Sequence, residues 1–512
     1  MNDPEQLLAL AIDGLRQSRM DDAAGHLDAA LALAPDHPHA NALRATIFLS
    51  QGNAAAALPL FRRSAEAKAQ DPVFQQNFAI ALLNQGAVEE AETHARQALA
   101  LNPQSAQAVG TLAQSLRHQG RDAEALPLLE QLAAAQPTAA VLNDLGLCLM
   151  DLNRPDQAEA AFRRVAEAAP DIPEPWHNLG NALLDQQRPD EAVAAYDRAL
   201  AVAPHDTASE VHKGQALLLS GNYREGWEAY EARWRLPVKL TLRDNLSTPL
   251  WDGSPLAGRR LLIYAEQGMG DAIQFARFLS MAADRGGQVI ADVPPALCRL
   301  FAAQDDGYAV SRQDQPAPPH DLRLPMMSLP RVLGIGLDDL PGPSPYLKIA
   351  DDPKWAQRLA GQPGTRVGLA WRALAEKRGS AQRSVPLSDL APLFAQPGLS
   401  WISLQKEIAA QDTPLPDALL DVSDGLGDFA DTAALIQQLD LVVTVDTAVA
   451  HLAGALGKPV WVMLPRGNDW RWLTGRADSP WYPTARLFRQ DDSRAWPPVV
   501  EAVARDLTEF AG

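Results

Sequence analysis

This sequence of 512 residues has few cysteines, no long apolar run and no excess of basic residues. Its two cysteines, Cys148 and Cys298, exclude a disulfide scaffold and a cysteine-rich zinc site, and they are typical of a reducing compartment. The formal net charge of −18 argues against a nucleic-acid partner, which usually meets a basic surface. No apolar run reaches the roughly 18 residues that cross a bilayer, and the charged N-terminal stretch does not resemble a signal peptide. We therefore expect a cytoplasmic protein without an integral membrane segment.

A repeat fills the sequence before residue 240. Seven turn-forming residues recur there at intervals of 33 or 34 positions. They are Ser18, Gly52, Gly86, Gly120, Asn153, Gln187 and Gly221. A small residue follows five positions after each of them, and in most units a large apolar residue follows nine positions after. The pattern indicates pairs of helices, because a turn joins the two helices and a small residue lets them approach closely.

Prolines close most of these units, seventeen positions after the turn residue, as at Pro35, Pro103 and Pro204. Proline ends the second helix before the next unit begins. The pattern resembles the tetratricopeptide repeat, most clearly in HNLGNALLDQQRPDEAVAAYDRALAVAP, and predicts about seven repeats over residues 1–237. Such units stack into a superhelix with a long concave groove. The groove predicts a peptide-binding surface; a rigid spacer or a dimerisation arm is the alternative.

Short apolar runs alternate with helical stretches after residue 240. The expected strands are 259–267, 288–293, 365–373, 399–405, 441–446 and 458–464. The expected helices are 271–286, 295–304, 387–395, 429–439 and 447–457. This β–α rhythm indicates parallel sheets covered by helices on both faces. A Pro- and Gly-rich linker near 338–363 divides the region into two Rossmann-like halves, 238–345 and 346–512, with a cleft between the carboxyl ends of their strands.

Polar residues gather where the strand 441–446 meets the next helix. Thr447 and His451 are four positions apart, so they share one face at the start of that helix. Free N–H groups and the positive end of the helix dipole lie there, which suits a phosphate group. Gln405 ends another strand at the rim of the cleft and could contact the same ligand. Trp470, Arg471 and Trp472 either frame the cleft or pack between the two halves. The loop after strand 365–373 adds Arg383, and with less support Lys377 and Arg378. The alternative is a capped helix with a satisfied histidine and a solvated basic loop.

Seven stretches in a fixed order give residues 245–505 a family resemblance. They are EQGMGDAIQFARF, VGLAW, RSVPL, SLQKE, LDLVVTVDTAVAHLAGALGKPVWVMLP, DWRWL and SPWYPTARLFRQ. The region resembles the glycosyltransferase-9, or heptosyltransferase-like, domain carried by bacterial tetratricopeptide-repeat proteins. The resemblance implies a GT-B fold with inverting chemistry, the acceptor bound mainly by the first half and the nucleotide-sugar donor mainly by the second. It assigns donor binding to Asp446, Thr447 and His451, and Arg383 matches the Arg-Ser pair of the family.

Asp271 has two interpretations. As a helix N-cap it would contribute about 1 kcal/mol to stability and do nothing else. The resemblance instead makes it the general base that accepts the proton of the acceptor hydroxyl, with Glu266 as the reserve candidate. Gly268 and Gly270 would let a ligand approach the backbone closely. Residues 240–512 contain no Asp-x-Asp pair, the usual metal-holding pair of metal-dependent sugar transferases, so we expect no metal and no cofactor.

Three functions remain open on the sequence alone. The first is a glycosyltransferase that modifies Ser or Thr of a protein recruited by the repeats. The family resemblance points there to flagellin and to nonulosonic sugars such as pseudaminic acid. The second is the same chemistry directed at a surface saccharide or a lipid-linked sugar, with the repeats used for assembly. The third is a non-catalytic scaffold. We favour the first, because a saccharide or lipid acceptor does not require seven peptide-binding units.

Overall fold

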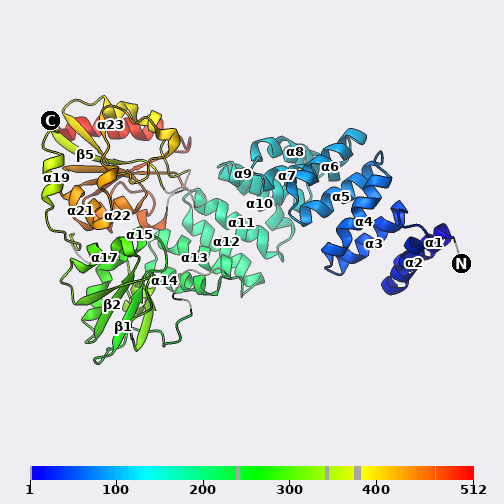
Figure 1. Ribbon diagram of the computed structural model, residues 1–512, viewed down its shortest axis with the longest axis horizontal. Helices are drawn as coiled ribbons and strands as arrows, with labels where there is room; N and C mark the ends of the chain where they lie inside the picture. The colour runs from blue at the N-terminus through cyan, green and yellow to red at the C-terminus, as the bar shows by residue number, and fades with distance from the viewer. Residues whose placement is uncertain are drawn as a thin grey trace. The chain divides into compact units, whose positions relative to one another are not determined.

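The computed structural model describes residues 3–237, 243, 245–340, 345–373, 382–467 and 469–511. The chain forms two compact units, Met1–Ala182 and Leu183–Gly512 (Figure 1). Within the described residues, the first unit is built of helices, whereas the second contains the last three helices of the repeat region together with two β-sheets. None of the helices within the described ranges is long and apolar enough to cross a membrane.

Helices α1 to α14 form seven successive pairs within residues 3–237. Their bounds are α1 Pro4–Arg16, α2 Met20–Leu33, α3 Pro38–Ser50, α4 Ala54–Ala67, α5 Pro72–Asn84, α6 Val88–Leu101, α7 Ala106–His118, α8 Asp122–Ala135, α9 Ala139–Asp151, α10 Pro155–Ala168, α11 Pro173–Asp185, α12 Pro189–Val202, α13 Thr207–Ser220 and α14 Tyr223–Tyr230. A short 3₁₀ helix, η1 Glu231–Arg235, follows the last pair. The predicted helical repeats are therefore confirmed.

The seven predicted turn residues all adopt a positive φ, between 58° at Ser18 and 90° at Gly221. This left-handed conformation reverses the chain between the two helices of a pair. The small residues five positions later are buried, which agrees with the predicted close approach of the two helices. At Gly226 an added Cβ would come within 2.8 Å of the Leu218 side chain, so the last pair requires a glycine there. Local sequence thus explains how each helix pair closes.

The first sheet contains four parallel strands in the order β3-β2-β1-β4. Their bounds are β1 Arg260–Tyr264, β2 Gln288–Val293, β3 Tyr308–Arg312 and β4 Leu322–Pro325. The helices of this half are α15 Met269–Phe275, α16 Leu279–Ala283, α17 Pro295–Ala302 and α18 Leu329–Leu333. The sequence predicted β1 and β2 but not β3 and β4.

The second sheet contains six parallel strands in the order β10-β9-β8-β5-β6-β7. Their bounds are β5 Thr365–Ala370, β6 Leu399–Ser403, β7 Leu419–Leu420, β8 Leu441–Val445, β9 Val460–Leu464 and β10 Ala485–Arg489. The helices of this half are α19 Pro353–Arg358, α20 Ala391–Phe394, α21 Phe429–Gln437, α22 Ala448–Ala455 and α23 Pro497–Ala511. Counted within its own half, this strand order is the 3-2-1-4-5-6 order of a doubly wound fold.

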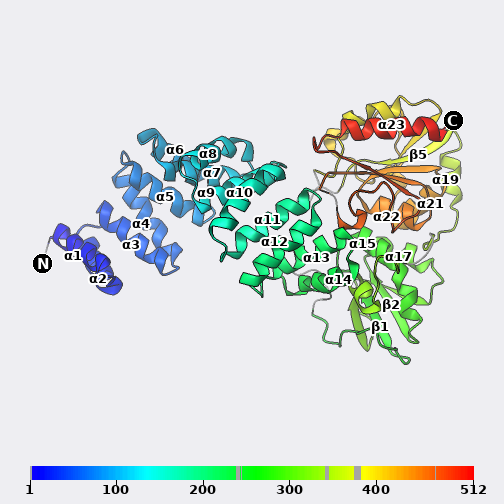
Figure 2. The same cartoon turned by 180° about the vertical axis from the view of Figure 1, so that it is seen from behind.

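The strand order of each sheet reverses beside its first strand, between β1 and β4 and between β5 and β8. Ligands of doubly wound folds bind at these switch points, outside the carboxyl ends of the strands. Helices α15 and α22, which begin after β1 and β8, contact each other and lie side by side in both views (Figures 1 and 2). The chain thereby brings the two switch points together.

Candidate active site

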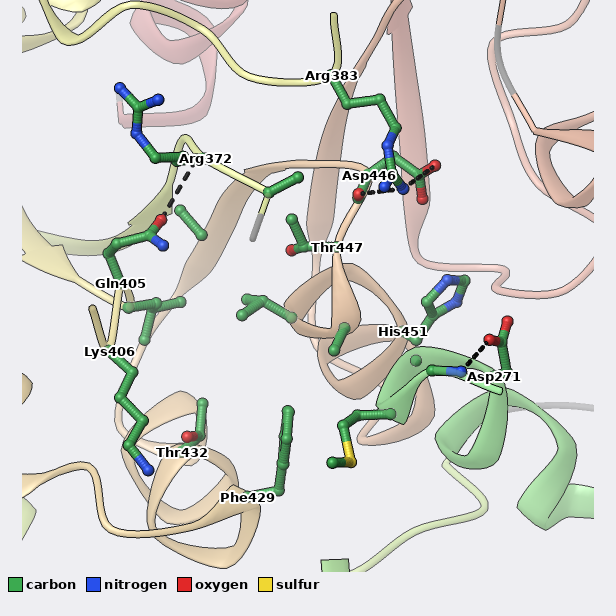
Figure 3. Close-up of a pocket in the computed structure, with 18 of the residues that line it drawn as sticks. Asp271, Arg372, Arg383, Gln405, Lys406, Phe429, Thr432, Asp446, Thr447 and His451 are labelled. Carbon is green, nitrogen blue, oxygen red and sulfur yellow. Dashed lines mark hydrogen bonds and ion pairs between the residues drawn. The ribbon is translucent and has the colours of Figure 1, made fainter. Parts of the chain in front are cut away.

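A pocket of about 580 Å³ opens where α15 and α22 begin (Figure 3). Its volume lies within the range of about 300–1,000 Å³ that is usual for small-molecule sites. Eight of the predicted site residues line it: Gly268, Gly270, Asp271, Arg383, Gln405, Asp446, Thr447 and His451. The wall also includes residues that the sequence did not single out as ligand groups, among them Lys406, Phe429, Asp469 and Arg471.

Asp271 lies in the first turn of α15, but it is not the N-cap residue that the alternative interpretation assumed. Gly268 occupies the N-cap position, and the Oδ2 atom of Asp271 accepts a hydrogen bond of 2.7 Å from its backbone N–H. The carboxylate therefore closes the start of the helix from the third helical position. This bond fixes the side chain at the wall of the pocket, where it is 19% exposed.

Arg471 holds the other oxygen of Asp271. It belongs to the 3₁₀ helix η7, Trp470–Trp472, on the second half of the fold. Its Nη2 donates to Oδ1 of Asp271, its Nη1 to Asp469 at 2.7 Å and its Nε to Gln274 at 2.8 Å. Burial would lower the pKa of Arg471, but attraction by Asp271 and Asp469 outweighs it and raises that pKa. A fully charged arginine thus ties the proposed base to the opposite half.

Thr447 is the N-cap residue of α22, yet its side chain makes no capping hydrogen bond. Its Oγ1 lies 3.3 Å from that of Thr444, and Thr447 itself lines the pocket. Beside it, Nη1 of Arg383 lies 3.6 Å from a carboxylate oxygen of Asp446 (Figure 3). Burial, followed by repulsion from Asp469, raises the pKa of Asp446, against the opposing effect of Arg383. A hydroxyl, a half-exposed guanidinium and a helix N-terminus converge here.

His451 is buried and is held by two aromatic residues. Its Nδ1 lies 2.8 Å from the hydroxyl of Tyr482, and its ring stacks on Trp472 with centroids 5.4 Å apart. Burial lowers its pKa well below the usual value, and the nearby charges of Arg471, Arg277 and Arg383 add to the effect. The imidazole is therefore neutral near pH 7, so it serves as a hydrogen-bonding group rather than a cation.

Gly270 lines the pocket and also has a packing role that the sequence did not suggest. An added Cβ would lie 2.8 Å from Cδ2 of His451 and 3.3 Å from Cα of Ala448. The missing side chain therefore leaves room for α22 and its histidine. Gly270 makes the junction of the two halves possible, and through that junction it places Asp271 beside the start of α22.

The wall opposite α15 is formed by the ends of β5 and β6. The Oε1 atom of Gln405 accepts a bond of 3.3 Å from the backbone N–H of Arg372. The Arg372 guanidinium turns to Asp412, which it contacts through two bonds of 2.8 Å. Lys406 donates to the carbonyl oxygen of Gly427 at 2.7 Å. The basic groups of this wall are already engaged by the protein.

The remaining predicted residues have separate outcomes. Glu266 does not line the pocket but lies buried behind it, in an ion pair with Arg233. Lys377 and Arg378 fall outside the described residues. Trp470 and Trp472 pack inside the protein, while Arg471 between them faces the pocket. In the described part of the chain, no three or more His, Cys, Asp and Glu side chains are grouped so as to hold a metal ion. Metal-independent transfer stays a prediction.

Comparison with protein families matches both regions of the chain. Tetratricopeptide-repeat models match residues 8–72 and 173–206, and the model of anaphase-promoting complex, cyclosome, subunit 3 matches residues 84–165. The model of glycosyltransferase family 9 (heptosyltransferase) matches residues 425–463. That stretch contains α21, β8 and α22, and hence Asp446, Thr447 and His451. The chain therefore contains tetratricopeptide repeats. The match of residues 425–463 suggests glycosyl transfer.

Individual proteins are also similar to the chain. Protein FlbA of Caulobacter vibrioides is 28% identical over 447 residues, which cover 80% of this chain and 74% of that protein. The solved structure of MamA from Desulfovibrio magneticus RS-1 is 22% identical and covers 32% of this chain and 94% of its own, with a TM-score of 0.31. A tetratricopeptide-repeat protein from Parabacteroides merdae is 14% identical and covers 46% and 93%, with a TM-score of 0.38.

Proposed function

We propose that this protein is a glycosyltransferase that moves a sugar from a nucleotide-sugar to a Ser or Thr hydroxyl of a protein acceptor. The observation that carries the proposal is the polar seat at the start of α22, where Thr447, Arg383 and His451 line the pocket. Thr447 and His451 of this seat lie within the stretch that matches glycosyltransferase family 9. We also propose a GT-B arrangement of the two halves and an inverting, metal-independent reaction.

The donor phosphate is proposed to bind at the N-terminus of α22. Backbone N–H groups at a helix N-terminus and the positive end of the dipole favour an anion. The Thr447 hydroxyl makes no capping bond and can donate to a phosphate oxygen. Arg383 has a side chain that is 35% exposed, so it can turn from Asp446 toward the ligand. These groups would stabilise the charge that develops on the departing nucleotide.

The sugar is proposed to lie between this seat and Asp271. The acceptor hydroxyl oxygen attacks the anomeric carbon, and a new C–O bond forms while the bond from that carbon to the phosphate oxygen breaks. The bonding pair leaves with the nucleotide phosphate, and the hydroxyl proton passes to the Asp271 carboxylate. Each oxygen of Asp271 already accepts one hydrogen bond and retains lone-pair capacity for this proton.

The acceptor is proposed to be a protein because stacked helical repeats offer an extended binding surface. Tethering an acceptor segment there raises the local concentration of its hydroxyls near the pocket. Flagellin, with a nonulosonic sugar as the transferred group, is the acceptor we propose from the family resemblance. A saccharide or lipid acceptor and a non-catalytic role are outcomes that the experiment below distinguishes.

The test begins with thermal-shift measurements of the full chain with CMP-, UDP-, GDP- and ADP-sugars, because a ligand of the native state raises its stability. The protein and the stabilising donor are then incubated with flagellin and with saccharide or lipid acceptors, and the masses of the products are measured by mass spectrometry. Protein modification supports the proposal. A saccharide or lipid product would move the enzyme to surface assembly, and no stabilising donor would favour a scaffold. Activity should persist in excess chelator; loss that Mn²⁺ or Mg²⁺ restores would contradict the metal-independent reaction.

A truncation tests recruitment by the repeats. A fragment that begins at residue 171 retains all of α11 and the second compact unit. We expect it to bind the donor as the full chain does but to modify the acceptor far more slowly. Full-rate modification by this fragment would show that the removed repeats do not recruit the acceptor. A cut at residue 237 would be a poor test, because Tyr230 of the seventh helix pair is hydrogen-bonded to Gln267, in the loop before the Asp271 helix.

A further inference from the structure

The end of the helical repeats is connected by hydrogen bonds to the loop that presents Asp271. The hydroxyl of Tyr230, the last residue of α14, accepts a bond of 3.0 Å from Nε2 of Gln267. One turn later, Nη2 of Arg233 lies 3.2 Å from Glu266. Glu266 and Gln267 directly precede Gly268, the N-cap residue of α15. The seventh helix pair and η1 together therefore contact both residues that lead into the Asp271 helix.

The Arg233 side chain is buried and is held in place by several hydrogen bonds. Its side chain is 3% exposed, and it donates to Ser328 at 2.9 Å and to the carbonyl of Tyr230 at 3.2 Å. Glu266, its partner, also accepts a bond of 3.1 Å from the backbone N–H of Met327. This ion pair joins η1 to the ends of β1 and β4, the switch point of the first sheet.

The same helix pair supports the other partner of Asp271. Tyr223 of α14 accepts a bond of 2.8 Å from Nε1 of Trp481, and Trp227 packs edge-on against Trp470 with ring centroids 5.2 Å apart. Trp470 is the neighbour of Arg471 in η7. Trp227 also donates to the carbonyl of Ile335 at 3.0 Å. Both sides of the Asp271–Arg471 pair thus rest on α14 and its extension.

The preceding repeat shows that this is a specialised use of a common position. Tyr196 stands nine residues after the turn at Gln187, as Tyr230 stands nine after Gly221. The ring of Tyr196 packs beside His212, a residue of the next repeat, with centroids 6.1 Å apart. Tyr230 instead directs its hydroxyl to Gln267 of the α/β fold. The same position of the repeat thus packs against the next repeat in one case and binds Gln267, in the loop before α15, in the other.

From these contacts we propose that Tyr230 and Arg233 are positioning residues of the transferase, so that the seventh repeat forms part of the active-site support. The inference rests on the proposed function, since it takes Asp271 as the base. Tyr230 acts through Gln267, and Arg233 acts through Glu266, on the backbone that begins α15. A displacement of the base by about 1 Å can lower the rate up to a hundredfold while the donor seat on α22 stays intact.

The main experiment compares Tyr230→Phe with Tyr196→Phe in the full chain. Both variants lose one buried hydroxyl at the same register position. We expect Tyr230→Phe to lower kcat about tenfold, with the donor dissociation constant by titration calorimetry within about twofold of wild type. Tyr196→Phe should leave both quantities within about twofold. Equal kcat for Tyr230→Phe and wild type would overturn the proposal, as would equal losses in the two variants.

A double-mutant cycle tests the connection to the loop. Gln267→Ala and Tyr230→Phe remove opposite ends of one hydrogen bond, so the double variant should lose no more kcat than the larger single loss. Multiplicative losses would show that the two residues act separately and would overturn the connection. Arg233→Lys should retain more kcat than Arg233→Met, because lysine keeps the buried charge opposite Glu266. If Arg233→Met does not fold, the Tyr230 cycle still decides.

Hydrogen exchange separates this inference from the proposed function. We expect amides 266–271 to exchange at least about threefold faster in Tyr230→Phe than in Tyr196→Phe, whether or not transfer is detected. Faster exchange without transferase activity would refute the function while retaining the contact. Transferase activity with unchanged exchange and unchanged kcat would refute the positioning role.

Discussion

The helical repeats and the α/β fold hold their side chains with contacts of very different sequence separation. In the repeats, a glycine packs against a residue of the same helix pair, as Gly146 does with Phe162. In the α/β fold, Arg471 binds Asp271 across 200 positions of sequence, and Trp481 of this fold reaches Tyr223 of α14 across 258. A substitution in the repeats should therefore act on its own pair, whereas one at the pocket should affect both halves.

The largest expected effect is on transfer itself. Asp271→Asn keeps the shape of the side chain but removes the base, so kcat should fall by about 10²–10⁴ while calorimetry finds unchanged donor affinity. Asp469→Asn provides the comparison, because it removes the other carboxylate that contacts Arg471. We expect less than about a tenfold loss of kcat there. Wild-type turnover by Asp271→Asn would show that Asp271 only caps the start of α15 and is not the base.

Two arginines test the contrast between the regions directly. Arg471→Met leaves two carboxylates without their partner, so the free energy of unfolding of the second unit should fall by about 3 kcal/mol. Eleven of the twelve tryptophans lie from Trp227 onward, so tryptophan fluorescence follows this unit. Arg117 has a comparable set of partners inside the repeats, Asp122, Asp144 and Asp151. Arg117→Met should leave the fluorescence transition in place and shift only helical circular dichroism. A fluorescence shift of equal size would remove the contrast.

The donor seat should respond more modestly. Thr447→Val removes the hydroxyl and breaks no capping bond, and His451→Ala removes the imidazole behind it. Each should weaken nucleotide-sugar binding about tenfold, the value of one hydrogen bond to a charged group. Thr508→Val, on α23 and outside the lining of the pocket, is the control and should bind the donor normally. Wild-type affinity in both site variants would place the donor elsewhere.

The pH dependence of stability isolates His451. Its pKa is lowered in the folded protein, mainly by burial, so below about pH 6.5 the unfolded chain binds a proton that the native state does not. Above about pH 6.5, His451 therefore does not reduce the free energy of unfolding. As the pH falls below that value, protonation of the unfolded chain lowers this free energy. Denaturant titrations followed by tryptophan fluorescence should show a shallower loss in His451→Gln. Identical slopes in the two proteins would mean that His451 does not titrate on unfolding.

The smallest effects belong to the repeat turns. Gly86 has a φ of 76° and open space around its missing Cβ, so Gly86→Ala should cost about 1 kcal/mol through backbone strain alone. Gln187 adopts a φ of 62°, and Gln187→Gly should relieve a similar strain, partly offset by the entropy of glycine. Thermal melting followed by circular dichroism measures both. Loss of transferase activity in Gly86→Ala would show that a repeat turn communicates with the pocket.

The strands that the sequence missed share a physical reason. β3 and β10 lie at the edges of their sheets, so each has exposed positions and lacks the continuous buried apolar run of β8 and β9. β4 is four residues long and ends at a proline, and β7 has two residues. Such short segments give no clear period. The buried central strands were predictable because both faces are covered.

The sequence by itself determined the helix pairs and their turns, the central strands, and the placement of Thr447 and His451 on one helix face. Each of these depends on residues within a few positions of one another. Only the tertiary structure decided that Arg471 holds Asp271, that Gly270 makes room for His451, and that Tyr230 differs from Tyr196 in what it contacts. The contacts of Asp271, Gly270 and Tyr230 join segments more than thirty residues apart in sequence. A local sequence period cannot predict which distant side chain lies opposite a given residue.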